Sequence, residues 1–71
     1  MKVFSTGEVA NLLGIHRDKV QTFLLNEKSP KPSMKIGNRK AWTEKDVTKF
    51  YEWLDGKGVA VKTPDFLAAA Q

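Results

Sequence analysis

The side chains best suited to chemistry in this sequence are the basic residues between His16 and Lys40. This stretch carries seven Lys or Arg against two acids, a net charge of +5, whereas the remainder carries a net charge of −1. Lysine and arginine donate charge-assisted hydrogen bonds to anionic oxygens such as those of phosphates. Cations gathered in one part of a small domain are typical of polyanion binders, and an ordinary solvated basic surface is the alternative.

No comparable set of residues supports catalysis or metal binding. The chain contains no cysteine and one histidine, His16, so it offers neither a thiolate zinc site nor a histidine cluster. Gly-rich phosphate loops and paired catalytic carboxylates are also missing from the sequence. We therefore predict that the protein is not an enzyme, has no catalytic or metal-binding residues and uses no cofactor.

The length and hydropathy of the chain predict one domain outside the membrane. With 71 residues, the chain has a thin core, because a domain of this size buries only about 60% of the surface that its unfolded form exposes. No apolar run approaches the roughly 18 residues of a membrane span. The N-terminus leads directly into a helix cap rather than a signal peptide, which predicts a cytoplasmic protein.

A first helix is predicted between Ser5 and Gly14. Ser5 and Glu8 have the spacing of a capping box, and an apolar stripe follows at Val9, Leu12 and Leu13. Glycine suits the left-handed position that closes a helix, so Gly14 marks the end of this one.

A second helix begins within two residues of Gly14, with His16 at its N-cap. Serine, threonine, aspartate or asparagine would cap better, so His16 is either a weak cap or a phosphate ligand. The apolar side of this helix consists of Val20, Phe23 and Leu24. Two helices joined by so tight a turn, the second with a polar and partly basic outer face, predict a helix-turn-helix whose second helix reads DNA.

Residues 34–42 predict a β-hairpin. A two-residue Gly37-Asn38 turn would leave Trp42 on the opposite face from Met34 and Ile36. A three-residue loop, Gly37–Arg39, pairs Met34 with Trp42 and gathers the apolar side chains on one face. We therefore predict the three-residue loop, whose exposed basic tip would form a wing beside the helix-turn-helix.

A third helix is predicted after Thr43, which caps it, with a buried stripe at Val47, Phe50, Tyr51 and Leu54. Trp53 falls just off this stripe and either extends the core or forms a patch for a partner. Gly56 and Gly58 end this helix.

The tail after Gly58 can begin another helical turn at Thr63-Pro64-Asp65. Its apolar end folds back on the domain, pairs with a neighbouring molecule or frays. The predicted fold class is mainly α: a winged helix-turn-helix of three helices plus a two-stranded β-hairpin wing. We assign residues 1–56 to this DNA-binding domain and residues 57–71 to a C-terminal tail that can form a short helix.

Several stretches of the sequence together resemble a known family. Residues 5–15 look like the opening of MerR-like and excisionase-type winged-helix domains. Ser29–Pro32, followed by Lys35–Arg39 and Ala41-Trp42, is similar to the wing region of AlpA-type phage regulators, and Glu44–Val47 agrees with the same pattern. The resemblance covers residues 3–54. It departs from the family at His16, where a small capping residue is usual, and at Asp18, an exposed acid that would either repel phosphate or accept a hydrogen bond from a cytosine amino group.

This resemblance implies a small regulator of a phage or mobile element that binds double-stranded DNA in a sequence-specific manner. Such proteins act as excisionases, which bend attachment-site DNA so that an integrase runs in the excision direction, or as transcription regulators. The second helix would enter the major groove, and the wing would follow the backbone or the adjacent minor groove. The partners implied are double-stranded DNA, an integrase or other recombinase, and further copies bound cooperatively.

Each candidate residue has a role in this hypothesis. Arg17 and Lys19 are suited to phosphates or guanine, and Gln21 and Thr22 lie on the outward face, where glutamine matches adenine. Arg39 is the candidate for minor-groove insertion, whereas Asn38 is explained as well by turn chemistry. The predicted DNA-binding residues are therefore His16, Arg17, Lys19, Gln21, Thr22, Lys35, Asn38, Arg39 and Lys40.

A second hypothesis makes DNA contact secondary. In this alternative the protein is an adaptor that recruits a recombinase or packaging enzyme through Trp53 and the C-terminal tail.

Overall fold

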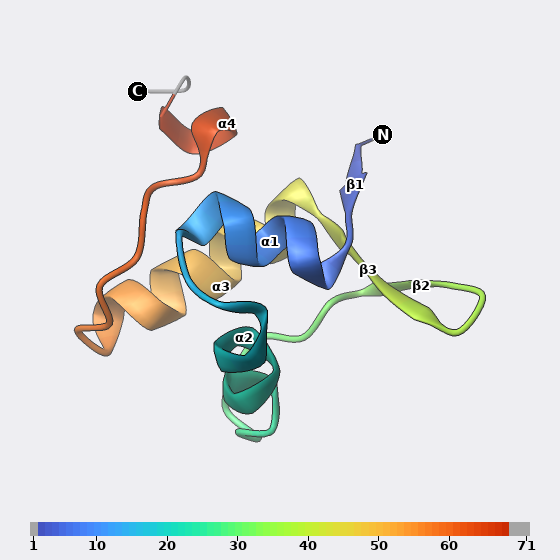
Figure 1. The fold of residues 1–71 in the computed structure, drawn as a ribbon, viewed down its shortest axis with the longest axis horizontal. Helices are drawn as coiled ribbons and strands as arrows, with labels where there is room; N and C mark the ends of the chain where they lie inside the picture. The colour runs from blue at the N-terminus through green and yellow to red at the C-terminus, as the bar shows by residue number, and fades with distance from the viewer. Residues whose placement is uncertain (1, 69–71) are drawn as a thin grey trace.

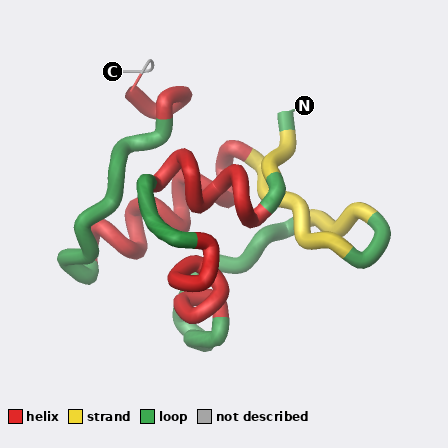
Figure 2. Tube along the Cα trace, in the orientation of Figure 1, coloured by secondary structure: helices red, strands yellow, loops and turns green. Residues whose placement is uncertain are grey.

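The computed structural model describes residues 2–68, which form four helices and a three-stranded antiparallel sheet (Figures 1 and 2). The strand order is β1-β3-β2, and the helices make up about half of the described chain. In chain order the elements are β1 (Val3–Phe4), α1 (Thr6–Leu13), α2 (Arg17–Leu24), β2 (Met34–Ile36), β3 (Arg39–Thr43), α3 (Glu44–Gly56) and α4 (Asp65–Ala68).

The caps of α1 confirm its predicted start and end. The Glu8 backbone N–H donates to Ser5 Oγ at 3.2 Å, and the Ser5 N–H donates to Glu8 Oε1 at 3.0 Å. Gly14 takes a left-handed φ of 69° after the last helical residue. Because this conformation carries no Cβ penalty in glycine, the chain turns at once into α2.

The prediction of a two-stranded sheet is wrong, because β1 adds a third strand. Val3 pairs with Thr43 and Phe4 pairs with Trp42 at the inner end of β3. Phe4 is buried at 5% exposure, and Trp42 is fully buried. Burial of these two aromatic rings draws the N-terminal segment into the sheet.

The predicted three-residue hairpin loop and the Met34–Trp42 pair are also wrong. The observed register pairs Met34 with Ala41 and Ile36 with Arg39, which leaves the two-residue turn Gly37-Asn38. Gly37 has a φ of 62°, whereas no described residue other than glycine has a positive φ, and this combination suits a type II′ turn. Trp42 finds its apolar neighbours in β1 and the helices instead of β2.

The hydrophobic core lies between α1, α3 and the inner half of β3. Val9 and Leu13 from α1 and Val47, Phe50 and Leu54 from α3 are fully buried. The Trp42 ring lies 5.2 Å from that of Phe50, and its indole N–H donates to Thr6 Oγ1 at 3.2 Å. β3 is therefore anchored at its inner end to both helices.

Up to residue 68 the tail folds back on the domain, which is one of the three predicted alternatives. The Lys62 N–H donates to the Leu13 carbonyl at 2.7 Å, and the Tyr51 and Thr63 hydroxyls are 3.1 Å apart. Phe66 in α4 stacks on Phe4 with ring centroids 5.7 Å apart. The end of the predicted tail, residues 69–71, lies outside the described residues. Within residues 2–68 no helix is long and apolar enough to cross a bilayer.

Asp46 connects the first turn of α3 to the chain that leads into β2. Its Oδ2 accepts hydrogen bonds from the Thr43 N–H at 3.0 Å, the Ser33 N–H at 3.0 Å and the Ser33 hydroxyl at 2.7 Å. Burial raises the pKa of Asp46, but the hydrogen bonds with Thr43 and Ser33 outweigh it and hold the pKa below its ordinary value. The carboxylate therefore stabilises both the start of α3 and the base of the hairpin.

We expect Asp46→Asn to lower the free energy of unfolding by about 1.5 kcal/mol at neutral pH, the size of a charge-assisted hydrogen bond. Because the folded pKa is depressed, this contribution is complete above the ordinary pKa of 3.8 and disappears as the pH falls through the folded value. Urea unfolding of both forms across this range measures the difference. Asp55→Asn, an exposed acid on the same helix, is the control, and a gap between wild type and Asp46→Asn that persists at low pH would contradict the assignment.

A second prediction concerns the tail. Phe66 packs on the core cluster, whereas its neighbour Leu67 is not part of that cluster in the described chain. We expect Phe66→Ala to lower the free energy of unfolding by about 1.5 kcal/mol, because half-buried aromatic area is lost. Leu67→Ala, the matched control, would change it by less than about 0.5 kcal/mol. Equal thermal unfolding midpoints for the two variants would show that α4 does not depend on the Phe66 contact.

Candidate nucleic-acid interface

A groove runs between α2 and the β2–β3 hairpin, with the start of α1 at its base. α2 and the hairpin project from the body in different directions (Figure 1). Side chains from both line the groove. Its lining contains three cations and no acid among the described residues. The lining residues are Ser5, Thr6, Gly7, Arg17, Gln21, Leu24, Leu25, Asn38, Arg39 and Lys40.

Helical spacing explains which side of α2 faces this groove. Arg17, Gln21 and Leu25 follow one another at i, i+4 and i+8 and so lie on one stripe. Val20 is fully buried on the inner side. The stripe ends in Leu25, whose side chain is 84% exposed. The groove wall formed by α2 and its C-cap therefore combines a cation, an amide and an exposed apolar side chain with the edge of the buried Leu24.

The hairpin supplies the opposite wall. The two-residue turn brings Asn38, Arg39 and Lys40 to the tip and the adjoining part of β3, and all three line the groove. Lys35 pairs with Lys40 across the hairpin and lies outside the groove, beside a separate hollow that runs along residues 31–35. Five of the nine predicted DNA-binding residues thus meet in one groove: Arg17, Gln21, Asn38, Arg39 and Lys40.

The other three predicted residues lie on α2 but do not line the groove. His16 caps the helix, because its Nδ1 accepts the Asp18 N–H at 3.1 Å. Lys19 is two residues from Arg17 and points to a different side of the helix. The Thr22 hydroxyl donates to the Asp18 carbonyl at 2.9 Å within the helix. Asp18 is likewise absent from the groove lining, so the acid noted in the sequence does not oppose an anion there.

Lys31, one of the seven cations of the basic stretch, serves the fold. Its ammonium group donates to the carbonyl oxygens of Leu24 and Asn26, the latter at 2.6 Å, and to Ser29 Oγ at 2.6 Å. Cations stabilise the C-terminal end of a helix, where carbonyl groups have no helical partner. Lys31 therefore holds the end of α2 and its following loop.

Sequence reasoning missed the contribution of the start of α1 to the groove. Ser5, Thr6 and Gly7 at the start of α1 form its base. Gly7 lies close to Arg17, since a Cβ at this position would be in ordinary van der Waals contact with Cδ of Arg17 at 3.7 Å. No spacing in the sequence relates the two positions.

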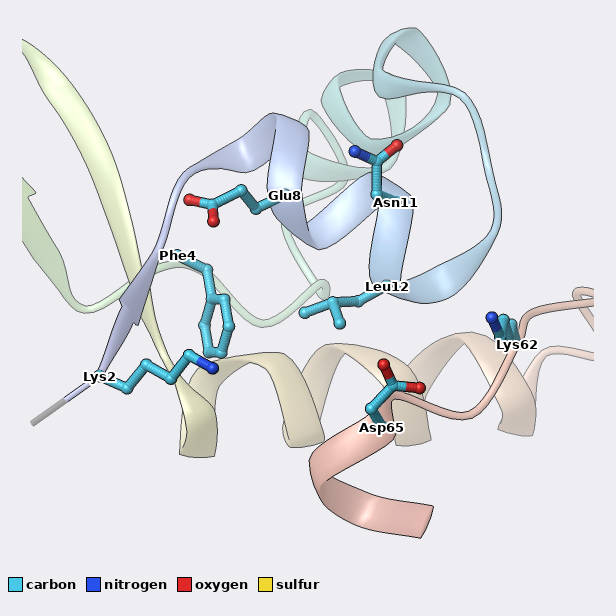
Figure 3. A pocket seen from close by; sticks show the side chains of 7 residues that line it. All are labelled: Lys2, Phe4, Glu8, Asn11, Leu12, Lys62 and Asp65. Atoms are coloured by element: carbon cyan, nitrogen blue, oxygen red, sulfur yellow. The ribbon is translucent and has the colours of Figure 1, made fainter. Parts of the chain in front are cut away.

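A second hollow, on the side of the tail, has a different character (Figure 3). Side chains from β1, α1 and the tail surround it, and Figure 3 shows Lys2 and Lys62 together with Glu8 and Asp65. Two cations and two acids balance one another, so this surface does not favour a polyanion. In the part of the chain that the structure describes, no three His, Cys, Asp or Glu side chains are grouped so that they could hold a metal ion.

Comparison with protein-family models, with curated proteins and with solved structures found no match for this chain.

The Lys31 ammonium group holds the carbonyl groups at the end of α2. We therefore expect Lys31→Ala to lower the free energy of unfolding by about 1 kcal/mol, because these carbonyl groups lose their partner. Lys28→Ala, an exposed cation in the same loop, is the matched control. Thermal unfolding of both variants measures the effect, and equal midpoints would mean that the ammonium contributes nothing to the end of the helix.

Proposed function

We propose that this protein binds double-stranded DNA as a winged helix-turn-helix, with α1 and α2 as the helix-turn-helix and the β2–β3 hairpin as the wing. The observation that carries the proposal is the groove of three cations without an acid, bordered by an exposed helix on one side and a basic hairpin on the other. Phosphate contacts supply most of the affinity of such proteins, so a surface of this sign fits a duplex.

The two walls of the groove suit different parts of a duplex. The α2 stripe combines Arg17, which can bind guanine or a phosphate, with Gln21, which matches adenine, and Leu25, which can touch a thymine methyl group. This stripe would enter the major groove. The hairpin tip would reach the neighbouring backbone or minor groove with Arg39. Base contacts from α2 would make binding sequence-specific.

We assign the protein to the regulation of a phage or mobile element, as an excisionase or a transcription regulator in the cytoplasm, with no catalytic activity of its own. These roles rest on the family resemblance of residues 3–54 together with the groove. An excisionase would occupy adjacent sites cooperatively and bend them beside an integrase. A transcription regulator would instead occupy a site that overlaps a promoter.

The adaptor hypothesis stays a prediction without a specific observation in its favour. Trp53 packs against Phe23 and Phe50, with ring centroids 6.0 Å apart in each case, and Lys57 Nζ lies 4.7 Å above its ring. Phe66 of the tail packs on the core. Trp53 and Phe66 are thus engaged within the domain.

The test uses a duplex selected from a random-sequence pool by the full-length protein. We expect Arg17→Ala and Arg39→Ala each to weaken binding about tenfold, because an arginine contact to a base or phosphate is worth about 1–3 kcal/mol. Affinity would fall steeply as salt rises, and each variant would reduce that slope by about one.

Lys49→Ala is the control, since it removes an exposed cation from α3, outside the groove; we expect a change of less than about twofold. Fluorescence anisotropy at several salt concentrations measures all four proteins. Failure to select any duplex, or affinity that does not vary with salt, would overturn the proposal.

A further inference from the structure

The hairpin exposes two large apolar side chains beside its basic tip. Ile36 is 59% exposed and Met34 is 37% exposed. Every residue of β2 is exposed, and Met34 and Ile36 lie on one face of the strand because neighbouring residues alternate between faces and paired residues share one. Trp42 occupies the core face of β3, so Met34 and Ile36 lie on the opposite face together with Arg39.

Ile36 lies at the far end of this face. It forms the last pair before the turn with Arg39, and the hairpin extends away from the helices (Figure 1). Arg39 lines the groove beside α2, whereas Ile36 does not. The tip therefore presents an arginine toward the groove and a β-branched apolar side chain immediately next to it.

The charge around this apolar tip indicates which partner binds it. From Pro30 to Thr43 the chain carries four cations and no acid. A second copy paired along the free edge of β2 would bring like-charged hairpins together, which is unfavourable. A duplex offers both complements, since phosphates attract the cations and the faces of stacked bases accept an apolar side chain once a step opens.

We propose that Ile36 is an apolar wedge that enters a base step from the minor groove and bends the duplex. This inference rests on the proposed function. Arg39 occupies the minor groove beside the wedge, and Lys35 and Lys40 bind the flanking phosphates. Unstacking one step is unfavourable, but the bend brings the duplex onto the cationic groove, and flexible steps such as TA open most easily.

The experiment uses the full-length protein and a short A·T-rich duplex with several TA steps, at low salt. 2-Aminopurine beside each step reports unstacking, and dyes at the two ends report bending by energy transfer. We expect wild-type protein to raise the 2-aminopurine emission and shorten the end-to-end distance. Ile36→Thr, which keeps a β-branched residue but removes its apolar end, is expected to abolish both signals and to weaken binding about fivefold.

Met34→Thr is the matched control, because it removes an exposed apolar side chain from the same face away from the tip; it is expected to keep both signals. Ile36→Gln repeats the removal, and circular dichroism verifies that each variant is folded. Binding without unstacking or bending, or the same signals in both Ile36 variants as in wild type, overturns the wedge and leaves the proposed function intact. Absence of binding by wild-type protein overturns both.

Discussion

The burial of Trp42 is the interaction on which the rest of the molecule depends. Its ring packs 5.2 Å from that of Phe50 in α3, and its N–H bonds to Thr6 at the start of α1. The same strand carries Arg39 and Lys40 at its outer end. Because β3 is held in the core at one end, the indole determines where the cations of the hairpin lie relative to α2. A single buried side chain thereby connects core packing to the geometry of the groove.

The loop between α2 and β2 is held at each end by hydrogen bonds to a charged side chain. Lys31 holds the carbonyl groups at the end of α2, and Asp46 holds Ser33 just before β2. A domain of this size has little apolar surface to bury. Hydrogen bonds to charged side chains therefore contribute a larger share of the stability of its loops. The loop that separates the walls of the groove is fastened mainly by polar contacts.

The hairpin register follows the geometry of the two-residue turn and does not gather the apolar side chains on one face. A three-residue loop would have gathered Met34, Ile36 and Trp42 on one face. Gly37 instead closes a two-residue turn, and Trp42 pairs with Phe4 of β1. Trp42 therefore has its apolar partner in β1, and Met34 and Ile36 lie exposed beside the basic tip of the hairpin.

Much of the local structure could be read from the residues alone, because caps and stripes depend on neighbours within one turn. The Ser5–Glu8 box, the left-handed Gly14 and the apolar stripe of α3 are of this kind. So is the concentration of cations between Arg17 and Lys40. The sequence by itself therefore determined the helices, the turn after α1 and the excess of positive charge between Arg17 and Lys40.

Only the tertiary structure decided which of those cations share a surface. Arg17 and Arg39 meet across the groove, Lys19 lies elsewhere on α2, and Lys31 is engaged with helix carbonyls. The third strand and the return of the tail through Phe66 were decided at the same level. The physical reason is that β1 and β3, α4 and β1, and α2 and the hairpin are far apart in sequence, so their contacts form only when the whole chain has folded.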